Sequence, residues 1–413
     1  MKHWDIVVYG ATGFTGRQAA RYLARRLGAD TDVRWAIGGR NREKLEALHH
    51  SLPSGVGLVV ADAKDQTAID ALVAGTRVVL TTAGPYALYG EPLVTACAHQ
   101  GVDYVDITGE TAHVRRLIDR YHDTAAGSGA KIVPFCGFDS VPSDLGVLLL
   151  VEHFRGRGLG TREVKGFFRA VGGLNGGTAA SMLEMWRHPN DVRAMEDPLL
   201  LNPHDQRRAD AALANRDPAW PVHDPDLGRW VAPFFMGPVN TRVVRRSRAL
   251  AAAMQADYGP HFSYQEFWDL GGPVPLLAAT GVAFGLAMSQ MFSRLPASAD
   301  FVARFVPAPG EGPTEATMDN GYFRALFVGT ADDTTKAWAE IADRGDPGNR
   351  VTVKILCEAA LALALARDRL PGGAARAGLL TPATGLGMVL VERLRAAGMT
   401  LDCPARPSGR EGR

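Results

Sequence analysis

Apolar and polar positions alternate in two ways along the first 150 residues. Six short apolar runs have the length and β-branched content of buried strands, and the stretches between them repeat apolar residues at helical spacing. Crossover helices between parallel strands produce this alternation, because such strands are buried on both faces. The pattern therefore predicts an α/β domain with a doubly wound parallel sheet over residues 1–150. The predicted strands cover 4–9, 34–38, 57–60, 77–81, 103–106 and 131–134, and the predicted helices cover 13–27, 42–51, 65–73, 91–99 and 111–126.

The pattern changes after residue 155 and indicates a second domain. Residues 322–329 and 336–342 alternate on either side of Asp332-Asp333, which is typical of an antiparallel hairpin. We therefore expect an α+β substrate domain with an antiparallel sheet over residues 155–349. Further strands are predicted at 164–171, 230–236 and 241–246, and a helix is predicted to end at Trp186.

The last part of the chain returns to a helical pattern. Residues 351–367 are rich in Ala and Leu, and a Thr381-Pro382 start signal precedes a second helix at 384–397. These helices, within residues 350–403, are expected to pack back on the first domain. Residues 404–413 are rich in Pro, Gly and Arg, and we expect them to form a flexible tail.

One long segment, residues 270–293, contains no charged residue. Its length approaches the ~20 residues of a membrane-spanning helix, but Pro273, Pro275 and Gln290 weaken that interpretation. The alternatives are a mobile hydrophobic helix, an ordinary buried helix and a true membrane span. We favour the first, a helix that binds an apolar substrate or makes peripheral contact with a membrane surface.

Composition excludes several classes of protein. The chain has 413 residues, a net charge of +1 and no long basic block, so we expect no nucleic-acid partner. The four cysteines lack CxxC spacing and no HExxH occurs among the eleven histidines, so no disulfide framework and no metal site are expected. A strand begins at Trp4, and we therefore expect a cytoplasmic protein without a signal peptide. A homodimer is one candidate assembly.

Three glycines follow the first strand at a spacing that favours nucleotide binding. Gly10 permits a tight turn, Gly13 lets the backbone approach a phosphate, and Gly16 lets the helix lie close to the strand. The spacing is GxxGxxG rather than GxGxxG, so an ordinary strand-to-helix turn is the alternative. The predicted pyrophosphate site also includes Thr12, Phe14 and Thr15.

The residue after the second strand indicates which nucleotide is bound. An NAD site has an acid here for the ribose 2′-hydroxyl, whereas this chain has Arg40 followed by Asn41. A guanidinium suits a 2′-phosphate, so the sequence favours NADP(H). The alternative is a surface arginine at a helix start. Asp62, after the third strand, either meets the adenine amino group or caps the next helix.

Loops after the later strands supply candidate catalytic groups, because ligands bind at the carboxyl ends of parallel strands. Tyr86 is the preferred hydrogen-bond donor to substrate and Tyr89 the second choice, although both rings could only pack the loop. Glu110 and Asp139 are candidate acids, and Glu110 could equally cap a helix. The glycine-rich residues 172–178 either hold a substrate anion or form a plain loop. Close backbone approach to the nicotinamide is predicted for Ala83, Gly84 and Pro85.

Motifs spread over nearly the whole chain resemble the saccharopine dehydrogenase-like oxidoreductase family and, within it, the trans-acting enoyl reductases. Asn349 departs from this resemblance, because many relatives have an aromatic residue after Asp-Pro-Gly. The matching motifs are Gly10-Ala-Thr-Gly-Phe-Thr-Gly16, Gly39-Arg40-Asn41, Ala83-Gly84-Pro85-Tyr86, Tyr89-Gly90-Glu91, Tyr104-Val-Asp-Ile-Thr-Gly-Glu110, Cys136-Gly-Phe-Asp-Ser-Val-Pro-Ser-Asp144, Gly176-Gly177-Thr178, Asp346-Pro347-Gly348, Glu358-Ala-Ala-Leu361 and Leu380-Thr381-Pro382-Ala383.

The resemblance implies a Rossmann domain, a catalytic α/β domain and NADPH-dependent reduction of an α,β-unsaturated acyl thioester. It also implies a hydrophobic acyl substrate of polyketide or lipid metabolism, carried by a carrier protein of a polyketide synthase. Two other functions stay open at this point. One is a non-catalytic, nucleotide-binding protein associated with a membrane or lipid. The other is a saccharopine-type amino-acid dehydrogenase, whose substrate would require convergent arginines.

Overall fold

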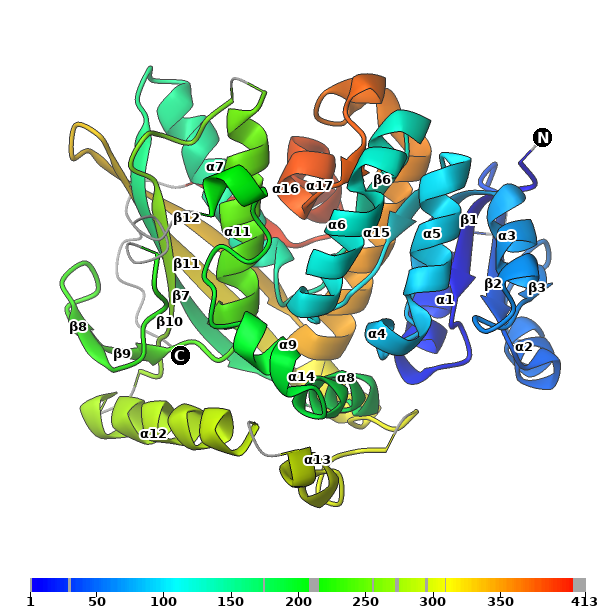
Figure 1. Cartoon of the computed structure of the whole chain (residues 1–413), viewed down its shortest axis with the longest axis horizontal. Helices are drawn as coiled ribbons and strands as arrows, with labels where there is room; N and C mark the ends of the chain where they lie inside the picture. Colours follow the sequence, from blue (N-terminus) through cyan, green and yellow to red (C-terminus); the bar gives the residue numbers. More distant parts are fainter. Residues whose placement is uncertain are drawn as a thin grey trace.

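Two seven-stranded sheets organise the chain. The computed structural model describes residues 2–28, 31–173, 175–207, 215–254, 256–271, 275–293, 296–308 and 310–403. In Figure 1 the blue and cyan N-terminal part builds one half of the molecule, and green and gold segments build the other half around the second sheet. The predicted fold class, a doubly wound parallel sheet with a second α+β unit, is confirmed.

The first sheet is parallel and has the strand order β13-β6-β5-β4-β1-β2-β3. All six predicted strands are present, each end within one residue of its prediction. The chain order reverses between β1 and β4, and the crevice outside the carboxyl ends of such strands is where doubly wound sheets bind ligands. The strands are β1 (Trp4–Tyr9), β2 (Trp35–Gly39), β3 (Gly57–Val60), β4 (Thr76–Thr81), β5 (Asp103–Val105), β6 (Lys131–Val133) and the unpredicted β13 (Gly378–Leu379).

The predicted helices of this half are also present. Short α4 (Tyr86–Tyr89) was not predicted, and it follows the loop after β4. The late helix α15 (Thr352–Leu365) packs on α1 and on β4, so a segment more than 250 residues away completes the core of this half. The other helices are α1 (Phe14–Leu27), α2 (Arg42–His49), α3 (Gln66–Ala74), α5 (Glu91–Gln100) and α6 (Thr111–Ser128).

The second sheet has the order β14-β12-β11-β7-β10-β9-β8. The predicted hairpin is confirmed, with β11 antiparallel to β12 and Val328 opposite Trp338. The prediction of an antiparallel sheet needs one correction, because β10 runs parallel to β7 and the sheet is mixed. Its strands are β7 (Thr161–Val171), β8 (Val222–Asp224), β9 (Arg229–Pro233), β10 (Ser263–Trp268), β11 (Tyr322–Ala331), β12 (Lys336–Arg344) and β14 (Thr400–Asp402).

The predicted strand at 241–246 is wrong, because these residues lie in the helix α11 (Gly237–Ala252). Three valines and a threonine over residues 239–244 gave the stretch its β-like composition. Pro238 at the first turn starts the helix instead. Arg242 and Arg245, three positions apart on one face of this helix, both bind the carboxylate of Asp217.

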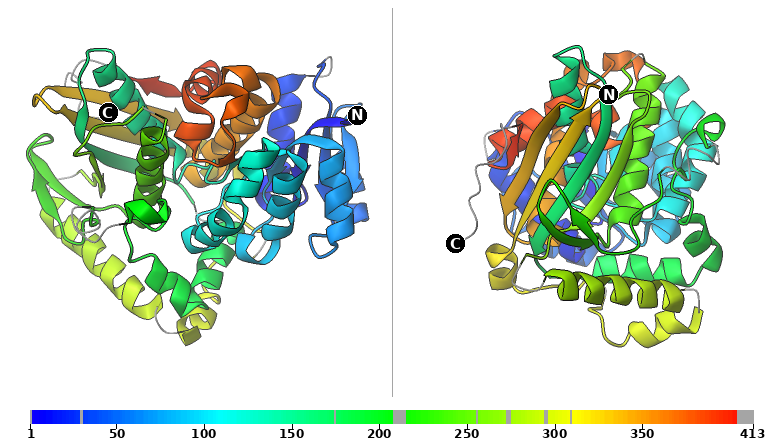
Figure 2. Two further views of the ribbon diagram at one scale, coloured as in Figure 1. Left: turned by 45° about the horizontal axis from the view of Figure 1, so that its top comes forward. Right: turned by 90° about the vertical axis from the view of Figure 1, so that its left-hand side faces the viewer.

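The two halves share elements. Helix α7 (Val141–Arg155) starts near the first sheet and packs on β7, β11 and β12 of the second. A Cβ on Gly146 would lie 2.4 Å from the Phe327 ring, so glycine permits this close packing. Figure 2 shows the orange and red C-terminal helices lying between the two halves. They are α15, α16 (Pro382–Gly385) and α17 (Gly387–Ala396).

The helices α12 (Pro275–Ser293) and α13 (Pro296–Val302) lie along one edge of the molecule in both figures. Helix α12 packs on β9, and α13 packs on α8 (Gly176–Trp186). Within the described residues, one helical stretch, Leu276–Ser293, is long and apolar enough to cross a membrane, and only 18% of it is buried. An ordinary buried helix is therefore the wrong interpretation of residues 276–293, and residues 272–274 of the predicted segment lie outside the described residues. The predicted tail at 404–413 lies outside the described residues.

The remaining elements are α9 (Pro189–Ala194), α14 (Glu315–Asn320) and four single turns at His204–Gln206, Pro347–Val351, Arg367–Arg369 and Gly373–Ala375.

Candidate functional site

The turn between β1 and α1 has the geometry that its glycines predict. Gly10 has a φ of +79°, and an added Cβ would lie 2.9 Å from the backbone nitrogen of Ala83. A Cβ on Gly16 would lie 2.2 Å from the Gly10 carbonyl oxygen, so glycine is required for the helix to approach the turn. Gly13 is the N-cap of α1, and no side chain caps this helix. Its first N–H groups can therefore donate to a pyrophosphate, and these residues fit a dinucleotide.

The other predicted residues of this turn surround the same helix start. The Thr12 carbonyl accepts a 2.8 Å hydrogen bond from the Arg17 guanidinium, and Thr15 lies in the first turn of α1. The Phe14 ring packs against Gly312, where an added Cβ would lie 2.4 Å from the ring. A segment of the second half therefore reaches the nucleotide turn, which the sequence did not predict.

Arg40 lies at the carboxyl end of β2 with an exposed side chain. Asn41 caps α2, since its Oδ1 accepts from the Lys44 N–H at 2.8 Å. Burial raises the pKa of Tyr9 to about 12, with a further raising effect of Asp62 and an opposing effect of Arg40. Both charged groups therefore lie near the same buried tyrosine at the sheet edge. Asp62 Oδ1 accepts from the Lys64 N–H at 3.0 Å, but the N-cap of the next helix is Asp65, whose Oδ1 accepts from the Ala68 N–H. The capping alternative for Asp62 is therefore wrong, and its contact with adenine stays a prediction.

The loop after β4 lies beside the glycine turn. Ala83 is the residue that approaches Gly10, and the Gly84–Pro85 peptide bond is cis. A Cβ on Gly84 would lie 3.4 Å from Ser181 Oγ, so α8 of the second half packs against this loop. The predicted juxtaposition of this loop with the nucleotide turn is thus present, although no ligand contact tests its role.

The two tyrosines of this loop differ in what they can do. Tyr86 is only 5% exposed, and its hydroxyl donates to the Thr81 carbonyl at 3.3 Å and accepts from the Ile107 N–H at 3.4 Å. Burial raises its pKa well above the ordinary value. Tyr89 is half-buried and its hydroxyl has no hydrogen-bond partner among the described residues. Tyr86 as donor stays a prediction, and its geometry favours a structural role.

Glu110 holds the loop in place. Its carboxylate accepts from the Tyr86 N–H at 2.8 Å and from the Ala87 N–H at 2.7 Å, so it caps α4 rather than its own helix. The Ser181 hydroxyl of α8 also donates to it. Burial raises the pKa of Glu110, and these hydrogen bonds oppose that effect. Glu110 thus joins the first sheet, the α4 loop and the second half.

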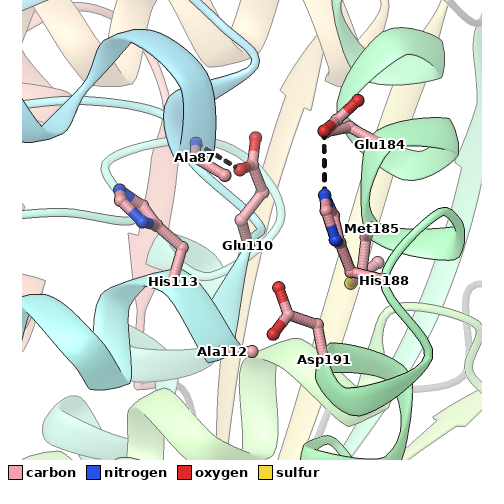
Figure 3. Close-up of a pocket in the computed structure, with 8 residues that line it drawn as sticks. All are labelled: Ala87, Glu110, Ala112, His113, Glu184, Met185, His188 and Asp191. Carbon is pink, nitrogen blue, oxygen red and sulfur yellow. Dashed lines mark hydrogen bonds and ion pairs between the residues drawn. The ribbon is translucent and has the colours of Figure 1, made fainter.

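A small cleft beside Glu110 collects titratable groups that the sequence analysis missed (Figure 3). Burial and the nearby Arg116 lower the pKa of His113 to about 4, which keeps its ring neutral. On the side of the cleft opposite to Glu110, a Glu184 carboxylate oxygen lies 3.1 Å from His188 Nε2 and forms a hydrogen bond with it. The acids and histidines lie in or directly before α6, α8 and α9, so only tertiary packing brings them together. The cleft is lined by Ala87, Glu110, Ala112, His113, Glu184, Met185, His188 and Asp191.

Asp139 follows β6 and precedes α7, at the same sheet edge. It is half-buried, and burial raises its pKa to about 6. No hydrogen bond or ion pair reaches its carboxylate from the part of the chain that the structure describes. A carboxyl group with this pKa can hold a proton near neutral pH and deliver it, as general acids do.

The neighbouring groups after β6 have structural roles. Asp144 is fully buried, with a pKa raised to about 7 by burial. Its two oxygens accept from the Ser247 hydroxyl at 2.5 Å and from the Ala383 N–H at 2.7 Å, so it caps α16. Cys136 is buried and its thiol pKa lies well above the ordinary value, which suits a small packing residue.

Several N–H groups of the glycine-rich residues before α8 already have partners within the protein. Asn175 Oδ1 accepts from the Thr178 N–H at 3.0 Å, and the Gly176 N–H donates to Glu311 at 3.0 Å. Asn175 also donates to Asn349 Oδ1 at 2.9 Å. These contacts favour the plain-loop alternative, because the protein's own oxygens occupy several of the donors, and anion binding by this loop stays a prediction. Asn349, which departs from the family pattern, ties this loop to the end of β12.

Comparisons with known proteins agree with this geometry. Residues 6–133 match the family model described as Saccharopine dehydrogenase NADP binding domain. A Mycobacterium tuberculosis protein, provisionally named a trans-acting enoyl reductase, is 42% identical over 423 residues, or 97% of each chain. The trans-acting enoyl reductase of Mycobacterium ulcerans is 38% identical over 424 residues with the same coverage. The structure of apo saccharopine dehydrogenase from Saccharomyces cerevisiae has a TM-score of 0.51 at 13% identity, covers 97% of this chain and 99% of its own, and shows the same fold.

Proposed function

The chain belongs to the saccharopine dehydrogenase-like oxidoreductase family, and we propose that it is an NADPH-dependent enoyl reductase acting in trans. The substrate is an α,β-unsaturated acyl thioester of a polyketide or lipid chain. The observation that carries this proposal is the similarity to proteins named trans-acting enoyl reductases over 97% of the chain, which includes the second half. A carrier protein would present the acyl chain, and a cytoplasmic location near the membrane surface is part of the same proposal.

The cofactor in this proposal lies on the glycine turn. The uncapped start of α1 would hold the pyrophosphate, and Arg40 would bind the 2′-phosphate. When bound, NADPH supplies a hydride to the β-carbon of the substrate. Glu110 would fix the α4 loop that faces the nicotinamide, through its two hydrogen bonds to backbone N–H groups.

Asp139 is the proposed proton source for the α-carbon. Its raised pKa, about 6, leaves a fraction of the carboxyl protonated at neutral pH, and its oxygens have no competing partner among the described residues. Tyr89 is the proposed donor to the thioester oxygen, because its hydroxyl is free within the described part of the chain whereas that of Tyr86 is engaged. Electrostatic stabilisation of that oxygen would lower the barrier to reduction.

A saccharopine-type amino-acid dehydrogenase is a weaker alternative. Its substrate carries several carboxylates, and the buried arginines of α11 would be the groups to receive them. Arg245 and Arg242 bind Asp217, and Arg246 donates to the carbonyls of Leu201 and Leu379. These guanidinium groups are already engaged, which supports an uncharged acyl substrate instead.

Turnover assays separate the alternatives. The purified protein should oxidise NADPH with enoyl thioesters and should not do so with matched saturated thioesters or with imino acids. Reduction of imino acids alone would support the dehydrogenase. Nucleotide binding without turnover of either substrate class would support the non-catalytic function. Indifference to both NADPH and NADH in titration calorimetry would overturn the whole proposal.

A further inference from the structure

The edge of the molecule formed by α12 and α13 exposes an apolar surface. Its large side chains are between 44% and 73% exposed. Isolated exposed apolar residues are common, but a contiguous group on two neighbouring helices marks an interaction site. Figures 1 and 2 show both helices on the outside of the molecule. We call this group the apolar edge, and its members are Leu276, Leu277, Phe284, Met291, Phe292, Phe301 and Phe305.

Helix α12 exposes large apolar side chains on the face where an ordinary surface helix exposes polar and charged ones. Its buried side chains are small, namely Ala279, Ala283 and Ser293. Leu277, Phe284 and Met291 are exposed, and Val282, Leu286 and Met288 are only half-buried. An added Cβ on Gly281 or Gly285 would meet nothing within 4 Å. A surface helix of a soluble protein turns its large apolar residues to the core and its charges to water. The orientation of α12 therefore suits an apolar environment outside the protein.

The apolar edge is large enough for either a bilayer or a second copy of the chain. At ~200 Å² for each large side chain, the exposed fractions amount to roughly 800 Å². Monomeric proteins usually expose no apolar patch above about 300–600 Å². A stable dimer buries about 800 Å² on each partner, so area alone does not choose between the two occupants.

The polar content of the edge makes that choice. Protein interfaces form about one hydrogen bond per 100–200 Å², so an 800 Å² face should offer roughly four to eight partners. The sequence has no charged residue from 270 to 293. Thr280, one of the few hydroxyls of α12, already donates to the Leu276 carbonyl at 2.8 Å. Hydrocarbon needs no hydrogen-bond partner, so the face fits lipid better than protein.

The end of the edge carries the charge that an anionic lipid would meet. Phe301 and Phe305 lie with ring centroids 5.3 Å apart, and both are exposed. Arg304, between them in sequence, is exposed and has no ion-pair partner among the described residues. Aromatic and cationic residues together are typical of helices that lie at the boundary between lipid headgroups and acyl chains.

We propose that the apolar edge binds the surface of an anionic lipid bilayer, with α12 in the plane of the membrane. The helix connects β10 to β11, two strands of the same sheet, so a membrane span would separate the strands. The segment that follows the edge reaches the nucleotide turn, because Gly312, after α13, packs against Phe14. If the proposed enoyl reductase function holds, the bilayer would bring long acyl chains to the site.

Vesicle sedimentation tests the proposal on the full-length protein. Wild type should bind phosphatidylcholine vesicles that contain phosphatidylglycerol. The double variant Leu277→Asp, Phe284→Asp should bind at least about tenfold more weakly, because charges would enter the acyl region. Leu365→Asp is the matched control, since Leu365 is 53% exposed on α15, and its binding should equal wild type. Arg304→Glu should weaken binding to anionic vesicles and leave binding to pure phosphatidylcholine unchanged.

Light scattering of the protein without lipid tests the competing occupant of the apolar edge, which is a second copy of the chain. A wild-type dimer that becomes monomeric in the double variant, together with no vesicle binding, would overturn the proposal in favour of a second copy of the chain. Equal vesicle binding by wild type and the double variant would also overturn it. Both measurements need no turnover, so a failed enoyl reductase assay would leave this proposal standing.

Discussion

Arg40 is the side chain on which the choice of nucleotide depends. It is exposed at the end of β2, beside the edge that Tyr9 and Asp62 define. A hydrogen bond to a charged group contributes about 1.5–3 kcal/mol. We therefore predict that Arg40→Ala weakens NADPH binding by about 10- to 100-fold and leaves NADH binding unchanged, as measured by titration calorimetry.

Arg42→Ala is the matched control for this prediction. Arg42 is an exposed neighbour on α2 whose only ion pair is with Glu46, one helical turn away, within the described chain. Its replacement should leave the affinity for both nucleotides unchanged. An Arg40→Ala variant that lost NADPH and NADH affinity equally would show that Arg40 supports the fold of the edge rather than the 2′-phosphate.

Asp139 gives the reaction a predicted pH dependence. Its pKa is raised to about 6 by burial, and a proton donor must be protonated, so kcat at saturating NADPH should fall as pH rises above about 6. The variant Asp139→Asn should lose at least about tenfold in kcat and lose this descending limb. Asp139→Glu should retain the descending limb, because it keeps a carboxyl group at this position. A limb unchanged in the Asn variant would assign the titration to another group.

The residues of the candidate site lie mainly in loops and at helix ends. The sequence placed the glycine turn, Arg40 and the α4 loop correctly at one edge, because strand and glycine patterns are local signals. It missed His113 and Glu184, because they lie on distant helices, α6 and α8, that are brought together by the packing of α9 against both. It also assigned part of α11 to a strand, because valine content outweighed the Pro238 start signal and the partner Asp217 is distant in sequence.

Glu110 connects the α4 loop to the start of α6 through two hydrogen bonds of its carboxylate. We predict that Glu110→Gln lowers kcat by at least about tenfold with little change in NADPH affinity, because an amide cannot accept from both backbone N–H groups as the carboxylate does. Hydrogen exchange at Tyr86 and Ala87 should become faster in the same variant. Glu91→Gln, on neighbouring α5, should change neither exchange rate. A lowered kcat with unaltered hydrogen exchange at Tyr86 and Ala87 would instead indicate that Glu110 takes part directly in the reaction.

The whole molecule depends on contacts between distant parts of the chain. The sequence predicted that the C-terminal helices return to the first half, and α15 does pack on α1 and β4. It could not predict that β13 joins the first sheet and β14 the second. Strand β13 has only two residues and only one residue of β14 is buried, so neither forms the buried apolar run that indicated the short strands β5 and β6. The parallel pairing of β10 with β7 was missed because the strand Ser263–Trp268 itself was not predicted.

Glu358 fastens these distant parts together. It is fully buried on α15, and its carboxylate accepts from the Tyr22 hydroxyl at 2.9 Å, pairs with Arg26 at 2.8 Å and pairs with Arg393 at 2.7 Å. Removing one partner of a buried ion pair costs about 3–5 kcal/mol, and the partial exposure of both arginines places the effect near the lower value. We predict that Glu358→Ala lowers the free energy of unfolding by about 3 kcal/mol in urea titrations. Glu392→Ala, which removes an exposed pair with Arg369, should cost no more than about 1 kcal/mol. Equal losses in the two variants would show that α15 is held by apolar packing alone, and that the buried carboxylate adds nothing to the joining of α1, α15 and α17.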